Sequence, residues 1–218
     1  MFSSSLPSIW INIPELPREL IEKYPRYEIQ KGTIIYAKGE NNPYLFYLHE
    51  GIVKISLFSK NGHEKILGFH LPNSLFGLDC LIENCQAVVN ATAYTNVIVS
   101  RLKQSEIHMM LEEHPKLAST ICAYYCSILR LMCFQAENHC FYDTLTKIVN
   151  FLYLTASTDN STNRTICLKE EELAALTGNS RVHVSRVLKE LKERNLIKTA
   201  RGKIIITDPE RLFKLCCF

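Results

Sequence analysis

The chain has 218 residues, of which 47% are hydrophobic and 22% are charged, and its formal net charge is +3 at pH 7. This composition is typical of a folded globular protein and excludes disordered and collagen-like chains. The charge is uneven, because residues 166–218 contain eleven Lys and Arg against seven Asp and Glu. The positive excess therefore lies in the C-terminal quarter, which favours a nucleic-acid partner for that part.

The first residues predict no export or membrane segment. Residues 1–10 lack both a basic region and a long apolar core, and no apolar run approaches the roughly 18 residues of a membrane helix. The nine cysteines do not have the spacing of a secreted disulfide framework. We therefore expect a cytoplasmic protein with reduced thiols. Prolines restrict this region to one short helix, around Glu15 to Tyr24.

From Tyr27 to about Leu102 the pattern is that of short strands separated by glycines. The runs with strand length and composition are Thr33–Tyr36, Tyr44–Leu48, Ile52–Phe58, Lys65–Phe69 and Asn96–Ser100. Many short strands with regular turns predict a β-sandwich or a double-stranded roll.

A long helix is predicted after the roll. A short helix over Ser105–Glu113 precedes Pro115, which can open a helix from about Lys116 to His139. Polar residues share one side of this helix, namely Lys116, Thr120, Ser127, Arg130, Glu137 and Asn138. Near the centre of the apolar arc, alternating steps of four and three residues form a coiled-coil seam of Ala118, Cys122, Tyr125, Leu129, Met132, Ala136 and His139. This spacing predicts a parallel homodimer.

Three cysteines spaced seven residues apart, Cys126, Cys133 and Cys140, border the seam. One hypothesis is a redox or metal sensor, with Cys122 and Cys126 at chelating spacing. The favoured interpretation is that small, nearly apolar thiols pack where the helix lies close to the roll, because no His or carboxylate completes a ligand set. His139 could act as a pH switch, but we favour a spacer near the helix end.

The helical register breaks at Phe141-Tyr142-Asp143, and Asp143 can cap the next helix, Thr144 to Thr155. A polar linker over Ser157–Arg164 follows.

Two short helices with a glycine turn are predicted over Leu173–Leu191. Leu173 and Leu176 give the first helix an apolar side, and the second carries an apolar stripe of Val184, Val187, Leu188 and Leu191. Gly178 can adopt a positive φ at the corner, and Ser180 can cap the second helix. Two β-rich runs then surround a turn at Gly202, with Lys198, Arg201 and Lys203 near its tip. This pattern predicts a winged helix-turn-helix; a plain helical corner is the alternative.

These residues resemble the CRP/FNR superfamily of bacterial transcription regulators. The matching residues are Glu172-Leu173-Ala174, Thr177-Gly178, Ser180-Arg181 and Val184–Leu188, and in the roll Lys31–Ile35, Lys38-Gly39-Glu40, Tyr47–Gly51, Asn61-Gly62 and Leu75–Gly77. The resemblance implies an α+β chain with an N-terminal double-stranded β-roll over 1–114, a dimerisation helix over 115–140 and a winged helix-turn-helix over 141–218. It also implies RNA polymerase as a partner, with a hinge at Phe141 and Asp143.

Two effector signatures of the superfamily are not matched. Leu78 and Asp79 follow Gly77, and Ala87–Asn90 stands where relatives carry the Arg-Ser pair for a cyclic phosphate, so cyclic AMP and cyclic GMP are disfavoured. The first cysteine is Cys80, which disfavours an N-terminal iron–sulfur cluster. We expect an uncharged or weakly polar small-molecule effector, and the resemblance implies a lining of Gly77, Leu78, Asn90, Thr92, Tyr125, Leu129, Met132 and Cys133.

The second helix of the motif is the expected DNA reader. Val182, Ser185, Arg186 and Lys189 point opposite to its apolar stripe. The candidate DNA-binding residues are Ser180, Arg181, Val182, His183, Ser185, Arg186, Lys189, Arg201 and Lys203. We expect Arg186 to bind a guanine, or a phosphate if it swings aside, and Arg181 to hold the backbone or an adjacent base. The resemblance marks two departures: Val182 replaces a glutamate, and Lys169 replaces the Thr or Ser that usually caps the first helix.

Two alternatives remain. A haem-based gas sensor of the same superfamily would use Cys80, Cys85 or a histidine as ligand. A metal-dependent enzyme built on the roll would need converging histidines and a carboxylate, whereas His49, His63 and His70 are scattered. We therefore expect no enzyme, and no role is assigned to Cys216 and Cys217.

Overall fold

The computed structural model describes residues 8–11, 18–82, 86–157 and 165–217. These described residues form two compact units, one within residues 10–59 and 67–128 and the other within residues 1–9, 60–66 and 129–218. The boundary between them falls inside one continuous helix, α3 (Pro115–Phe141). Each unit is described by itself.

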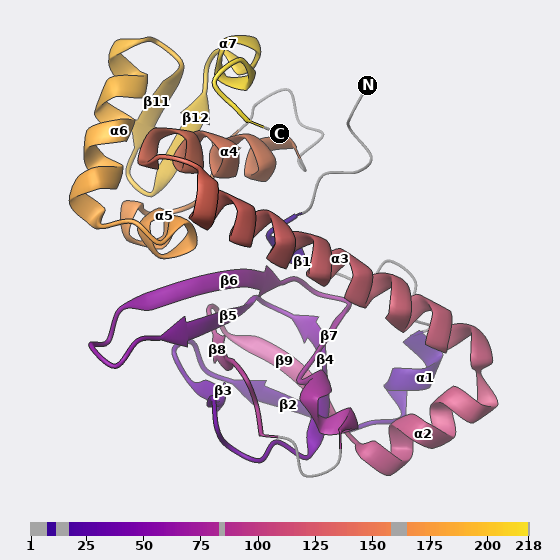
Figure 1. Cartoon of the computed structure of the whole chain (residues 1–218). Helices are drawn as coiled ribbons and strands as arrows, with labels where there is room; N and C mark the ends of the chain where they lie inside the picture. The colour runs from indigo at the N-terminus through magenta and orange to yellow at the C-terminus, as the bar shows by residue number, and fades with distance from the viewer. Residues whose placement is uncertain (1–7, 12–17, 83–85, 158–164, 218) are drawn as a thin grey trace. The chain divides into compact units, whose positions relative to one another are not determined.

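Two β-sheets build the first unit, except that residues 64–66 at the start of β6 group with the second unit (Figure 1). The five-stranded sheet has the order β1-β6-β5-β8-β3 and the four-stranded sheet the order β2-β9-β4-β7. The strands are β1 (Trp10–Ile11), β2 (Arg26–Ile29), β3 (Ile34–Tyr36), β4 (Tyr44–Glu50), β5 (Val53–Phe58), β6 (Glu64–His70), β7 (Ser74–Phe76), β8 (Asn90–Ala93) and β9 (Val97–Lys103). The short helices are α1 (Arg18–Glu22), the 3-10 helix η1 (Leu78–Leu81) and α2 (Gln104–Glu113). The predicted roll is confirmed.

Side chains from both sheets fill the roll. Tyr36, Phe46 and Phe76 stack on one another with ring centroids 5.1–6.3 Å apart. Aliphatic residues such as Val53, Val97 and Val99 join the same buried cluster. Burial of this much apolar surface is the main force that holds the two sheets together.

A buried hydrogen-bonded chain anchors the first part of α3 within this unit. The Tyr124 hydroxyl donates to the Leu75 carbonyl at 2.6 Å and lies 3.1 Å from Nδ1 of His70. The Tyr124 hydroxyl proton is already donated to the Leu75 carbonyl. The neutral imidazole of His70 therefore donates its Nδ1–H to the Tyr124 oxygen. Burial lowers the pKa of His70 to about 3, so it is neutral at physiological pH.

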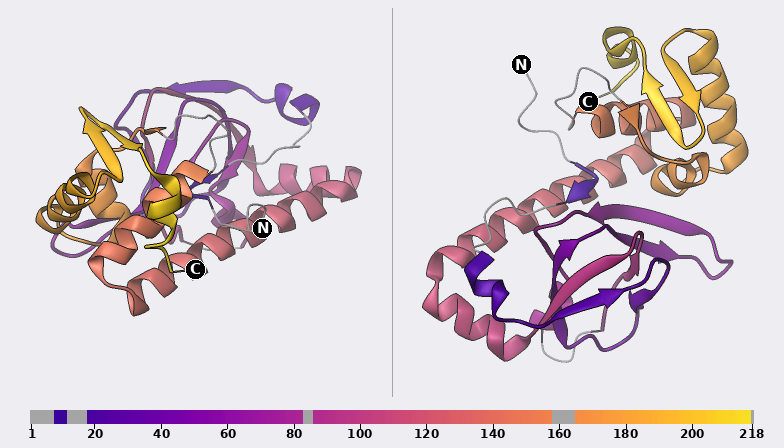
Figure 2. Two further views of the ribbon diagram at one scale, coloured as in Figure 1. Left: turned by 90° about the horizontal axis from the view of Figure 1, so that it is seen from above. Right: turned by 180° about the vertical axis from the view of Figure 1, so that it is seen from behind.

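The second unit contains the rest of α3, then α4 (Thr144–Ser157), α5 (Glu170–Thr177), α6 (Arg181–Glu193) and α7 (Pro209–Phe213). A small sheet has the order β10-β12-β11, formed by β10 (Thr165–Ile166), β11 (Ile197–Ala200) and β12 (Lys203–Ile206). Both views in Figure 2 show the β11–β12 hairpin beside α6. The predicted helix-turn-helix and wing are confirmed; most of the predicted linker, residues 158–164, lies outside the described residues.

Several sequence predictions were wrong in detail. β2, β7 and β8 have only three or four residues and were missed, because unlike the equally short β3 they are not rich in β-branched residues. Asn138, assigned to the polar side of the long helix, is buried. The expectation that no segment could cross a membrane also fails by length and composition, since α3 is long and apolar enough for that. Only 28% of the most apolar window of α3 is buried within the chain, so this helix carries an uncovered apolar surface.

Candidate nucleic-acid interface

The corner between α5 and α6 has the geometry that the sequence predicts. Gly178 has a φ of 68°, a left-handed conformation that glycine adopts without strain. The Ser180 hydroxyl accepts the backbone N–H of His183 at 3.3 Å and caps α6. Val184, Val187, Leu188 and Leu191 are all buried, which fixes the rotation of α6 about its axis.

The opposite face of α6 is open to solvent. Val182, Ser185, Arg186 and Lys189 are all exposed, and Val182 has 69% of its surface accessible. No described residue forms an ion pair with Arg186, whereas Lys189 pairs with Glu193 at 3.9 Å. The guanidinium of Arg186 therefore extends from the helix without an intramolecular partner in the described chain. The apolar side chain of Val182 and the guanidinium of Arg186 could both contact base edges in a DNA major groove.

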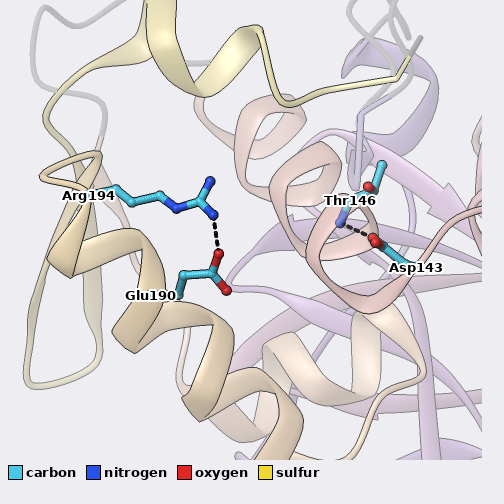
Figure 3. Close-up of polar contacts among 4 residues, drawn as sticks. All are labelled: Asp143, Thr146, Glu190 and Arg194. Carbon is cyan, nitrogen blue, oxygen red and sulfur yellow. Dashed lines mark hydrogen bonds and ion pairs between the residues drawn. The ribbon is translucent and has the colours of Figure 1, made fainter.

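Arg181 and the start of α5 differ from this open face. Arg181 is exposed but forms an ion pair with Glu171 of α5, with an N–O distance of 3.0 Å. At the other end of α6, Arg194 pairs with Glu190, as Figure 3 shows. The Glu172 carboxylate accepts the backbone N–H of Lys169 at 2.7 Å. Lysine has no acceptor atom, so only one half of a capping box is present where relatives place Thr or Ser.

The wing adds a basic surface beside α6. Ala200 pairs with Lys203, so the hairpin turns over Arg201 and Gly202, and Gly202 has a φ of 69°. Lys198, Arg201 and Lys203 are all exposed. The groove between the wing and the first turns of α5 and α6 contains Lys169, Arg181, Arg201 and Lys203 together with Glu170 and Glu171. This arrangement offers cations to a phosphate backbone on one side of the reading helix.

The helix break behind this motif is confirmed. α3 ends at Phe141, which is exposed, and α4 begins at Thr144. The Asp143 carboxylate accepts the backbone N–H of Thr146 at 2.8 Å (Figure 3), and this hydrogen bond lowers the pKa of Asp143 below its usual value. The cap stays ionised at neutral pH, which stabilises the start of α4.

Sequence reasoning missed a buried polar network beside this break. The Asn150 amide, fully buried in α4, donates to Oδ1 of Asn138 at 3.1 Å. The same amide accepts the backbone N–H of Cys217 at 3.1 Å and donates to its carbonyl. Asn138 is therefore buried because it has a partner on the next helix. A single asparagine within the apolar run Ile148–Leu154 was the available signal.

The predicted effector residues of the roll have unequal positions. Gly77 has a φ of 84°, and a Cβ there would lie 2.9 Å from the Tyr44 carbonyl, so the position requires glycine; Leu78 follows it in η1. Ala91 and Ala93 are buried in the roll core, so Asn90 and Thr92 point to the other face of β8. The Asn90 amide is occupied, since it accepts the N–H of Lys38 and donates to the carbonyl of Ser56. Asn90 and Thr92 therefore do not face the roll interior.

The predicted seam and the cysteines lie on exposed parts of α3. Ala118, Cys122, Tyr125, Leu129, Ala136 and His139 are exposed, and Met132 is half-buried. Cys126, Cys133 and Cys140 are exposed as well. The expectation that these thiols pack against their own roll was wrong. The side chains of Cys80 and Cys85 lie outside the described residues.

Comparison with known proteins decides the family. The model of the Crp-like helix-turn-helix domain matches residues 146–215, and that of the cyclic nucleotide-binding domain matches residues 26–114. Together they cover most of the chain.

The chain belongs to the CRP/FNR family of transcription regulators.

Relatives of this family match over nearly the whole chain. A global nitrogen regulator of Synechocystis is 24% identical over 91% of this chain and 89% of its own length. The cAMP-activated global transcriptional regulator CRP of Escherichia coli is 27% identical over 85% of this chain and 88% of its own. Among solved structures, a CooA variant from Carboxydothermus hydrogenoformans has a TM-score of 0.79 at 17% identity, covering 93% and 94% of the two chains.

The c-di-GMP-responsive regulator CLP of Xanthomonas campestris has a TM-score of 0.77 at 20% identity, covering 87% of this chain and 99% of its own. The relatives whose names state a role, among them the transcriptional regulator CRP, are regulators rather than enzymes. The chain is thus an effector-responsive, DNA-binding transcription regulator.

Proposed function

We propose that this regulator acts in the cytoplasm as a homodimer that binds palindromic DNA through α6. The observation that carries the proposal is the open face of α6, where Val182, Ser185 and Arg186 are exposed beside a basic wing. The N-terminal residues of such a helix contact base edges in the major groove. Arg186 would donate hydrogen bonds to a guanine, and Val182 would contact a thymine methyl group.

The remaining DNA contacts are assigned to the edges of this face. Arg201 and Lys203 of the wing, with Lys189 and Arg181, would contact phosphates, and Ser180, His183 and Ser185 would complete the interface. Arg181 is held by Glu171 in the free protein, so it must leave this ion pair to reach DNA. An exposed pair contributes at most about 1 kcal/mol, so DNA can displace it.

The uncovered surface of α3 supports the dimer. Tyr125 and Leu129 are 40% and 63% exposed, although both are large apolar residues. They lie at the a and d spacing of a parallel coiled coil together with Ala118, Cys122, Met132 and Ala136. Pairing of two copies would cover this stripe and give the DNA-bound assembly twofold symmetry, with RNA polymerase as the further partner at promoters.

The same helix connects effector and DNA in this proposal. Gly77 and Leu78 of the roll and Tyr125, Leu129, Met132 and Cys133 of α3 would contribute to the effector site, whereas Asn90 and Thr92 point to the other face of β8 and are left out of it. We keep the domain limits at 1–114, 115–140 and 141–218, with Phe141 and Asp143 as the hinge. An effector changes DNA binding only if the protein binds it more tightly in one arrangement of the paired α3 helices than in another. The apolar lining favours an uncharged or weakly polar ligand, which native mass spectrometry of the purified protein would detect.

Binding-site selection from random duplex DNA tests the assignment of α6. The wild type should select two half-sites about one helical turn apart, with A·T at the pair that faces residue 182. The matched variant Val182→Glu should change that pair to G·C, because a carboxylate accepts from cytosine N4. The pair that Arg186 reads should be the same for both proteins. Strong selection of G·C by the wild type at the Val182 position would contradict the assignment, as would identical sites from both proteins.

A further inference from the structure

The proposed function uses Cys122 and Cys133 of α3 only as packing and lining residues and makes no use of the thiol chemistry of this helix. Cys122, Cys126, Cys133 and Cys140 are all exposed in the single chain, and no group of three or more potential metal ligands occurs among the described residues. A metal site is therefore not supported by this surface. In a homodimer paired through α3, the surroundings of each of these four thiols depend on its heptad position.

The heptad register separates one of these cysteines from the other three. Cys122, Leu129 and Ala136 are seven residues apart and occupy position a, while Tyr125 and Met132 occupy position d. Cys126, Cys133 and Cys140 follow the d residues directly and occupy position e. In a parallel pair, a and d residues pack in layers against the same residues of the second copy, whereas e residues face position g.

The g positions carry no thiols. They are Ile121, Ile128 and Gln135, of which Ile121 and Gln135 are buried within their own chain. No e-position thiol therefore meets a thiol of the second copy. Cys122 alone faces a thiol, because on the twofold axis it meets the Cys122 of the second copy.

We propose that the two Cys122 thiols of the homodimer form a reversible intersubunit disulfide that makes the regulator responsive to the thiol–disulfide balance of its surroundings. This inference rests on the proposed homodimer. Bridges that form in a reducing compartment are typically regulatory.

The reaction needs a small disulfide such as oxidised glutathione. The Cys122 thiolate of a dissociated chain attacks one sulfur of that disulfide, forms a mixed disulfide and releases one glutathione thiol. After pairing, the second Cys122 thiolate attacks the Cys122 sulfur of the mixed disulfide and releases the other glutathione. Two thiols lose two electrons and two protons, and one glutathione disulfide is reduced to two glutathiones.

The bridge would change how DNA binding depends on protein concentration. A regulator that binds DNA only as a dimer loses affinity when dilution separates its subunits. A covalent bridge keeps the subunits together at any dilution. Below the dissociation constant of the dimer, the oxidised protein should occupy DNA at a lower total concentration than the reduced protein.

To test this, the full-length protein is equilibrated with varied ratios of reduced and oxidised glutathione, and the amount of covalent dimer is measured on non-reducing gels. Size-exclusion chromatography under reducing conditions gives the oligomeric state of the same proteins. Wild type and the matched control Cys126→Ser should give a covalent dimer that dithiothreitol reverses. Cys122→Ser should give at least tenfold less while it still elutes as a dimer. Its DNA occupancy at high dilution should not respond to oxidation, whereas that of the wild type should rise.

Each outcome decides between the two proposals. Equal cross-linking of Cys122→Ser and wild type would overturn the register and the proposed bridge. A wild type that elutes as a dimer but never cross-links would overturn the bridge and leave the proposed function intact. A wild type that elutes as a monomer, reduced and in the presence of its selected DNA site, would overturn both.

Discussion

Replacement of Arg186 by alanine tests whether α6 reads DNA sequence. Arg186 is exposed and has no ion-pair partner among the described residues, so its truncation removes no ion pair from the described chain. The free energy of unfolding should change by less than about 0.5 kcal/mol, as is usual for surface substitutions. Any loss of DNA affinity then reports a lost protein–DNA contact rather than a damaged fold.

The size of that loss follows from the chemistry of the contact. A bidentate arginine–guanine pair contributes about 1 to 3 kcal/mol of discrimination. At about 1.4 kcal/mol per tenfold change in affinity, this corresponds to a loss of roughly 5- to 150-fold on the selected site. Affinity for random duplex DNA should fall much less, because phosphate contacts dominate non-specific binding.

A matched control lies at the C-cap of the same helix. Arg194, at the C-terminal end of α6, pairs with Glu190 (Figure 3) and lies away from the residues assigned to base contacts. Arg194→Ala removes one positive charge directly after α6 and should leave affinity for the selected site within a few-fold of wild type. The assay is titration of labelled duplexes at fixed salt, with every base pair of one half-site varied. Arg186→Ala binding with wild-type affinity and an unchanged base preference would refute the reasoning.

Two further predictions concern the wing and the roll. Lys203→Ala should lower the magnitude of the slope of log affinity against log salt by about 1 with little change in base preference, and an unchanged slope would remove Lys203 from the phosphate contacts. The pKa of His70 falls from 6.5 to about 3 on folding, so below pH 6.5 the unfolded chain binds a proton that the folded chain does not. Stability should therefore decrease as the pH falls from 6.5 towards 3, by up to about 1.4 kcal/mol per pH unit from this group. Urea unfolding of His70→Gln should show a shallower decrease than wild type between pH 6.5 and 5, and equal slopes would contradict the assignment.

The DNA-binding part was predictable because its signals are local. The apolar stripe of α6, the glycine at its corner and the Ser180 cap all lie within a short stretch, and each has a single geometric consequence. The long helix and the break before Asp143 were predictable for the same reason. Short strands such as β7 (Ser-Leu-Phe) and β8 (Asn-Ala-Thr-Ala) were missed, because they show no period and lack the β-branched residues that marked the equally short β3 and β12.

Other features depend on partners far away in the sequence or outside the chain. Asn138 looks like a solvent-facing residue until the Asn150 amide lies beside it. The orientation of the Thr92 side chain depends on strand pairing, which decides the face of β8 to which this side chain points. The cysteines of α3 were expected against the roll, but they are exposed in the single chain, and the proposed homodimer would place a second helix beside them. The periodicity of the sequence predicts which face of α3 is apolar, but it does not predict which surface covers that face.

The spacing of DNA protection tests the central claim most directly. Hydroxyl-radical footprinting on the selected site should show two protected regions related by a twofold axis, with centres about one helical turn, or roughly 34 Å, apart. This spacing is expected when two copies, paired through α3, present Val182 and Arg186 to successive turns of the major groove. A single protected region, bound by a protein that remains a monomer on DNA, would contradict the account.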